Sequence, residues 1–175
     1  MINFYKFHTG RLDKCEYEEP ITLIQSLDWL DSDRGPKCNK VLHIIKRHPH
    51  YAYKFARDVI GGRWPEAEPT ILKDSFYTFQ YIKNIIKGRW LEAEPALMKQ
   101  PDYAYMYANY IIKGRWPEAE PYIMKEAFAV YYYAKVVIKG RWVEAEDVIR
   151  EDETYWEDYC KMFELWGDYY RIFGL

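Results

Sequence analysis

The sequence has 175 residues, 49% of them hydrophobic, which is enough for the core of one domain or one short array of repeats. Its net charge is −2, so it lacks the strongly basic composition by which many proteins bind nucleic acid or anionic membranes. Aromatic residues reach 19%, with 18 Tyr and 7 Trp, and such side chains suit repeat interfaces and binding surfaces alike.

The three cysteines are an odd number with no close pair: Cys15, Cys38 and Cys160. This pattern argues against a disulfide framework and favours a reducing compartment. The N-terminal residues contain no apolar run of signal-peptide length, and no stretch approaches the length needed to span a bilayer. We therefore expect a soluble protein of the cytoplasm.

Residues 1–39 are expected to form an N-terminal arm and helix. Within residues 1–19, apolar and polar side chains alternate around Ile2, Phe4 and Phe7, which is typical of a short strand or an irregular arm. After Pro20, apolar side chains follow helical spacing at Ile21, Ile24, Leu27 and Leu30. Residues 31–36 have the composition of a loop.

A Gly-Arg-Trp-x-Glu-Ala-Glu motif then recurs every 26 residues without insertion or deletion. Its four copies begin at Gly62, Gly88, Gly114 and Gly140. A fixed period of this length predicts an all-α fold, a short α-solenoid of tandem two-helix repeats. The repeats are expected over residues 40–153, with a degenerate repeat at 40–50 and full repeats from residue 51. Residues 154–175 are expected to form an acidic C-terminal cap helix.

Each full repeat is predicted to contain a first helix that is covered on two sides. These helices are expected at residues 51–60, 77–86, 103–112 and 129–138, where apolar side chains cover about 200° of the helix surface. The glycine that follows is expected to end the helix in a left-handed conformation: Gly61 or Gly62 in the first repeat, then Gly88, Gly114 and Gly140.

The second helix of each repeat has two possible starting points. Pro65 and Pro117 suit a first helical turn, but Pro69, Pro95 and Pro121 follow four residues later and would leave little more than one turn. In both cases the tryptophan is expected to pack between the two helices, in a stripe such as Trp116, Ala119 and Ile123.

These residues resemble a tandem repeat of phage and other viral open reading frames, built on the pattern YA..VIKGRWPEAEPYI. Residues 103–124 match the pattern nearly letter for letter, and the resemblance covers about residues 44–160. The resemblance implies a viral origin and a non-enzymatic accessory role. It carries no catalytic residues over to this chain, and residues 1–35 lie outside it.

The paired glutamates and the arginines of the motif favour a structural interpretation. Glu66 and Glu68 are about 200° apart on a helix, so they do not face each other as an acid/base pair would. We expect them to compensate the helix dipole and to pair with arginines of the Arg63 type in the same or the next repeat. Such pairing would also neutralise a phosphate-binding arginine ladder.

The polar side of the first helices is the candidate partner-binding surface. It combines cations with tyrosines at Lys83, Lys87, Tyr110, Lys113, Tyr132, Lys135 and Lys139. An ordinary solvated face is the simpler interpretation. Exposed tyrosines beside lysines also suit an acidic protein or a nucleic-acid strand.

No other motif indicates chemistry. Cys38, His43, His48 and His50 lie close together, but they lack the paired cysteines of a typical zinc site, so we expect no metal and no cofactor. Glycine-rich phosphate loops, nucleophile elbows and dinucleotide fingerprints are absent from the sequence. We therefore expect no enzyme.

We expect a phage-encoded protein that binds a host protein and inhibits a bacterial defence system, for example a CRISPR effector. The alternative is nucleic-acid or nucleotide binding through the Lys/Tyr face.

Overall fold

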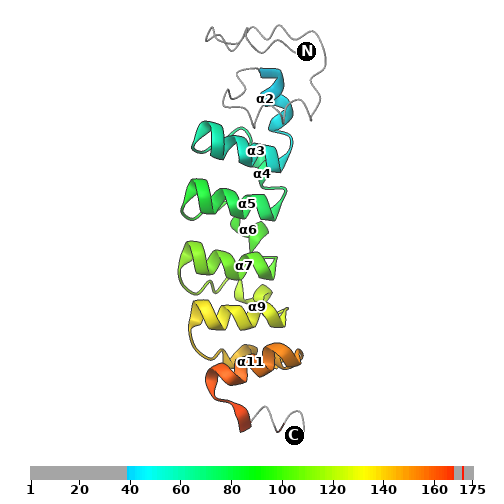
Figure 1. Cartoon of the computed structure of the whole chain (residues 1–175), viewed down its shortest axis with the longest axis vertical. Coiled ribbons are helices and arrows are strands. Elements are labelled where there is room, and N and C mark those ends of the chain that lie inside the picture. Colours follow the sequence, from blue (N-terminus) through cyan, green and yellow to red (C-terminus); the bar gives the residue numbers. More distant parts are fainter. Residues whose placement is uncertain (1–38, 168–170, 172–175) are drawn as a thin grey trace. The chain divides into compact units, whose positions relative to one another are not determined.

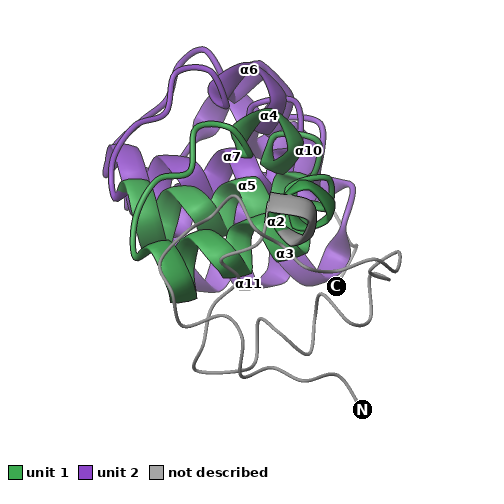
Figure 2. Ribbon diagram, turned by 90° about the horizontal axis from the view of Figure 1, so that it is seen from above, with its two compact units in different colours: residues 1–86 green, residues 87–175 purple. Residues whose placement is uncertain are grey.

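The computed structural model describes residues 39–167 and residue 171, and every regular element within them is a helix. The all-helical part of the fold prediction is therefore confirmed. The chain divides into two compact units, residues 1–86 and residues 87–175 (Figure 2). The predicted N-terminal arm lies outside the described residues, together with Cys15 and Cys38.

The first unit contains α2, two longer helical segments and one short helix between them. Its described elements are α2 (Asn39–Ile45), α3 (Pro49–Phe55), η2 (Ala56–Ile60), α4 (Glu68–Ile71), α5 (Ser75–Tyr81) and η3 (Ile82–Ile86). The elements η2 and η3 are π-helices that continue α3 and α5. Helices α3 and α5 lie side by side (Figure 1), and the short α4 packs against both of them.

The second unit repeats this arrangement. Its elements are α6 (Glu94–Leu97), α7 (Pro101–Tyr107), η4 (Ala108–Ile112), α8 (Glu120–Ile123), α9 (Ala127–Tyr132), η5 (Tyr133–Ile138), η6 (Val143–Ala145), α10 (Glu146–Arg150) and α11 (Glu153–Phe163). Helix α9 packs between α7 and α11, so the three helices lie side by side (Figure 1). Helix α11 occupies most of the described part of the predicted C-terminal cap.

The first helix of each repeat begins two residues earlier than the sequence pattern predicts. Pro49 and Pro101 occupy first-turn positions, where the missing N–H costs nothing. The Asp74 side chain accepts a hydrogen bond from the backbone N–H of Tyr77 at 3.1 Å and caps α5. These start signals precede the first core residue, which is why apolar periodicity alone places the boundary too late.

The core sides of these helices follow the prediction. Small or β-branched residues at the second and sixth positions of each predicted first helix are fully or almost fully buried, among them Ala52, Ala56, Ala104 and Ala108. The helices end at the predicted residues, but their final turns are π-helical rather than α-helical, from η2 to η5.

The prediction of a left-handed glycine is correct for the first repeat and wrong for the other three. Gly61 has φ +67°, but the left-handed residues of the later repeats are Lys87, Lys113 and Lys139, with φ of +55°, +60° and +56°. Each lysine stands immediately before the predicted glycine. The reason is the π-turn: the N–H of Lys113 reaches the carbonyl of Ala108, five residues back, so the helix closes at lysine.

The second helix of the first three repeats begins at the later of the two predicted starting points, next to Pro69, Pro95 or Pro121, and is therefore short. Helices α4, α6 and α8 each have 4 residues and start at the second glutamate of the motif, with proline next. The predicted packing of the tryptophan stripe holds, because Trp116, Ala119 and Ile123 are all buried. The Trp116 ring lies 5.1 Å from the ring of Tyr107 on the first helix of the same repeat.

An Arg–Glu–Tyr network, in which the tyrosine is buried and the arginine is exposed, joins each repeat to the next first helix. In the first copy, Arg63 donates two hydrogen bonds of 2.8 Å to the Glu68 carboxylate. The Tyr81 hydroxyl donates to the same carboxylate at 3.0 Å and accepts the backbone N–H of Trp64 at 2.6 Å. The expected pairing of arginine with glutamate therefore holds within one repeat, and tyrosine is its unpredicted third member.

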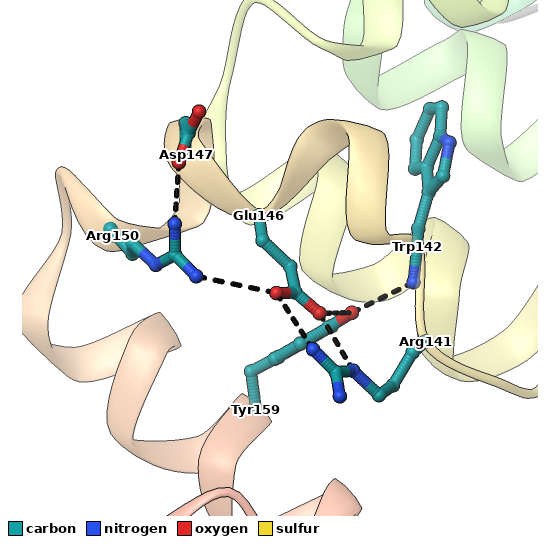
Figure 3. Close-up of polar contacts among 6 residues, drawn as sticks. All are labelled: Arg141, Trp142, Glu146, Asp147, Arg150 and Tyr159. Carbon is teal, nitrogen blue, oxygen red and sulfur yellow. Dashed lines mark hydrogen bonds and ion pairs between the residues drawn. The ribbon is translucent and has the colours of Figure 1, made fainter. Parts of the chain in front are cut away.

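The network occurs four times with the same partners. The other copies consist of Arg89, Trp90, Glu94 and Tyr107; Arg115, Trp116, Glu120 and Tyr133; and Arg141, Trp142, Glu146 and Tyr159. Figure 3 shows the last copy, in which Arg150 also donates to Glu146 at 3.4 Å. The tryptophan N–H, the glutamate carboxylate and the tyrosine hydroxyl thus all have hydrogen-bond partners. The carboxylate can therefore be removed from solvent at the start of the short helix.

Electrostatics in the network follow from these contacts. The hydrogen bonds from Arg63 hold the pKa of Glu68 below its ordinary value, although burial opposes this effect. Burial raises the pKa of Tyr81 to about 12, and the hydrogen bond to Glu68 adds to the rise. The carboxylate therefore stays ionised and the phenol stays neutral over a wide pH range.

None of the described helices is both long and apolar enough to cross a membrane.

Candidate functional site

All seven predicted partner-binding residues are exposed, so the polar side of the first helices is assigned correctly. They do not form one continuous site. Tyr132 and Lys135 take part in a cluster of aromatic rings in the second unit, and Tyr110 stands beside that cluster. Lys87, Lys113 and Lys139 occupy the left-handed helix ends. Lys83 belongs to the first unit.

The tyrosine cluster consists of Tyr105, Tyr131, Tyr132 and Tyr155, which come from α7, α9 and α11. The Tyr105 and Tyr132 rings stack with centroids 5.6 Å apart and an interplanar angle of 15°. Tyr155 lies 5.5 Å from Tyr131 and 6.3 Å from Tyr132. Helix-to-helix packing thus connects four phenol rings across three neighbouring helices, with Tyr132 in contact with the other three.

The cluster is open to solvent at its centre. Tyr132 retains 36% of its surface, and Tyr105 and Tyr155 are half-buried, whereas Tyr131 is buried at 5%. Burial raises the pKa of Tyr105, and the neighbouring Tyr132 phenol adds to this rise. The Tyr105 phenol therefore keeps its proton, and its hydroxyl can donate and accept hydrogen bonds at the rim of an aromatic surface.

Lys135 supplies a positive charge to the cluster. Its Nζ donates to the Tyr131 hydroxyl at 3.1 Å and lies 5.2 Å from the centre of the same ring. The hydrogen bond to Tyr131 raises the pKa of Lys135. The arrangement combines an exposed apolar ring surface, hydroxyl groups and a cation, which is a chemistry suited to another polypeptide.

The first unit carries a related but smaller group of rings. His50 stacks on Tyr77 at 5.1 Å, and Tyr53 lies 6.2 Å from Tyr77. Asn84 donates to the Tyr53 hydroxyl at 2.7 Å, and Arg57 lies over the Tyr53 ring at 5.2 Å. The pairing of a tyrosine with a cation four residues later therefore occurs in both units.

Sequence reasoning missed three of the four clustered tyrosines. Tyr105, Tyr131 and Tyr155 fall at positions that the periodicity assigns to the buried arc of the first helix. These three tyrosines lie at the edge of the predicted buried arc, and this edge position could have indicated that they reach the polar side of the helix, where Tyr132 lies. A phenol ring at such an edge is long enough to reach the rings of a neighbouring helix.

Cys38, one of the residues considered for a metal site, lies outside the described residues. Among the described residues, no group of histidine, cysteine and acidic side chains could hold a metal ion. The His50 ring packs on tyrosine, and Cys160 is buried in α11. Glu68 is ion-paired and buried while Glu66 is exposed, which agrees with the expectation that the two carboxylates do not face each other.

Comparisons with known proteins add no relative. No protein-family model matches the sequence, no curated protein matches it, and no solved structure matches its fold. The resemblance to phage and viral repeats therefore stays a prediction.

Proposed function

We propose that this chain is a non-enzymatic, protein-binding repeat protein whose tyrosine cluster is the central part of its binding surface. The observation that carries the proposal is the contact of four tyrosine rings from the neighbouring helices α7, α9 and α11, with the exposed Tyr132 at their centre. Tyrosine is enriched among the residues that dominate binding energy, because it buries a large area at low entropic cost.

The proposal includes an α-solenoid architecture for residues 40–153. Four identical Arg–Glu–Tyr networks support it, because each one links a repeat to the first helix of the next repeat at the same atoms. Arrays of this kind present side chains of successive repeats as an extended binding surface. The network holds the helices in register, and the surface residues can then vary between repeats without loss of the fold.

The alternative proposal is nucleic-acid binding, with bases stacked on the exposed tyrosines. Charge disfavours it: the four arginines of the motif are each paired with a glutamate, and residues 87–175 carry 12 basic and 16 acidic side chains.

Viral origin and inhibition of a bacterial defence protein rest on the resemblance alone and stay predictions.

The experiment is affinity capture from a bacterial lysate with the immobilised full-length chain, with and without nuclease. We expect one stoichiometric protein in both conditions. The double variant Tyr132→Ala, Tyr155→Ala should lose it, whereas Tyr122→Ala, which removes a half-buried tyrosine from α8, should retain it. Nuclease-sensitive recovery would instead support the alternative, and recovery of no protein would contradict protein binding.

A further inference from the structure

Three lysines occupy a backbone conformation that suits glycine better. Lys87, Lys113 and Lys139 have φ of +55°, +60° and +56°, and we call them the lysine row. At the equivalent place in the first repeat the chain has Gly61, with φ +67°. A left-handed conformation is costly for a residue with a Cβ atom and easy for glycine. The left-handed backbone therefore disfavours lysine here, so what favours lysine must be its charged side chain.

The lysine row lies at the C-terminal ends of η3, η4 and η5, where the helix dipole favours a positive charge. Each of the three side chains is exposed, and none makes an ion pair or hydrogen bond with the described residues. The arginine two positions after each lysine is, by contrast, paired with a glutamate, as in Arg115 with Glu120. The second unit thus separates its recurring cations into a structural set that is paired and a surface set that is free.

Two members of the lysine row, Lys113 and Lys139, end the helical segments that carry Tyr105 and Tyr132 of the tyrosine cluster. Lys135, which contacts Tyr131, and Lys139 lie four residues apart on η5 and its left-handed end. Tyr110 and Lys113 lie three residues apart on η4 and its left-handed end, and η4 packs against η5. A ligand that covers the tyrosine rings therefore passes close to unpaired positive charges.

We propose that the lysine row binds an acidic segment of a protein partner, with carboxylates of aspartate or glutamate opposite Lys113 and Lys139. This inference rests on the proposed function and names its partner class. Polypeptide fits better than nucleic acid, because residues 87–175 have a net charge of −4 and their exposed Glu118 and Glu144 would repel a continuous chain of phosphates. A short acidic peptide can place single carboxylates on single ammonium groups.

The test is fluorescence anisotropy of the full-length chain with two labelled probes: a twelve-residue peptide of alternating glutamate and tyrosine, and a twelve-nucleotide oligothymidylate. We expect the peptide to bind, with an affinity that falls as salt rises. The triple variant Lys87→Gln, Lys113→Gln, Lys139→Gln should weaken binding roughly tenfold. The matched control Lys73→Gln, Lys99→Gln, Lys125→Gln removes three other exposed lysines, also 26 residues apart, and should leave affinity within about twofold.

A second variant separates binding from folding. Lys113→Gly with Lys139→Gly should raise the melting temperature while it weakens peptide binding, an outcome that a purely structural role of these lysines does not give. Equal losses in both triple variants, binding of oligothymidylate alone, or binding of neither probe would overturn the inference. If the lysine triple variant still captures the lysate protein while the tyrosine variant does not, the lysine inference fails and the proposed function stands.

Discussion

The Tyr107 hydroxyl satisfies two buried groups at once. It accepts the backbone N–H of Trp90 at 2.9 Å and donates to Glu94 at 2.9 Å, and the side chain is fully buried. Tyr107→Phe leaves both groups without this partner, so we expect the free energy of unfolding to fall by about 2 kcal/mol in urea denaturation. Tyr122→Phe, on a half-buried ring, should change it by less than about 0.5 kcal/mol.

The chain contains an internal precedent for removing the network as a whole. At the positions one repeat before Glu68 and Tyr81 stand Leu42 and Phe55, so carboxylate and hydroxyl are replaced together. Phe55 keeps the ring contact, with its centroid 4.8 Å from that of Trp64. The double variant Glu94→Leu, Tyr107→Phe should therefore cost about 1 kcal/mol less than the sum of the two single variants, and strict additivity would contradict the coupling.

The strain at the lysine row can be measured at one residue. Lys113→Gly relieves a left-handed backbone at φ +60°, and we expect a gain of about 1 kcal/mol in the free energy of unfolding. Gly61→Lys is the reverse experiment: a Cβ at Gly61 meets no atom within 4 Å, so any loss comes from backbone conformation and not from a clash. A loss of stability in Lys113→Gly would show that the lysine side chain itself supports the fold.

At the scale of helices, periodicity predicts which residues are buried better than it predicts how a helix ends. The 26-residue spacing locates every first helix, and all four C-terminal ends, such as Ile60 and Ile112, are correct. The π-turn is not predictable from apolar spacing, because one additional residue per turn leaves the buried positions of the preceding α-helix unchanged. For that reason the left-handed residue was expected at Gly114 and lies at Lys113.

The candidate site was predictable in part for a similar reason. The polar arc identifies Tyr132 and Lys135 as exposed, since exposure follows from helix phase alone. The contact of Tyr132 with Tyr105 depends on how two helices approach each other, and a single sequence does not contain that distance. Likewise the arginine–glutamate pair follows from local spacing, whereas Tyr133 joins it from 13 residues away.

Removal of one repeat tests the element-level organisation. Deletion of residues 103–128 takes out 26 residues and joins equivalent positions, so that Tyr133 takes the place of Tyr107 beside Glu94. We expect a folded helical protein that melts about 5 °C lower, because one repeat interface is lost. Circular dichroism provides the measurement. Deletion of 13 residues, 103–115, joins unlike positions and should abolish the cooperative transition; equal behaviour of both deletions would contradict a repeat array.

Across the whole molecule, the repeated networks make stability depend on pH at both ends of the scale. The arginine hydrogen bonds lower the pKa of Glu68, Glu94 and Glu120, so these carboxylates bind protons more weakly when the chain is folded. Burial raises the pKa of Tyr81 and of Tyr159 to about 12, so these phenols hold their protons more tightly when the chain is folded. Both shifts favour the folded state near neutral pH.

The sign of each effect fixes the expected pH profile of thermal stability. Unfolded glutamate has a pKa of about 4.3, so the carboxylate contribution is complete above that pH and is lost as the pH falls through the lower folded values. Unfolded tyrosine has a pKa of about 10, so the phenol contribution is complete below that pH and is lost between about 10 and 12. We expect a plateau of melting temperature from about pH 5 to 9.5, with a decline on either side. In Tyr81→Phe the alkaline decline should become shallower, because one shifted phenol is gone, while the acid decline persists. An alkaline decline identical to that of the unaltered chain would show that the buried phenols do not govern it.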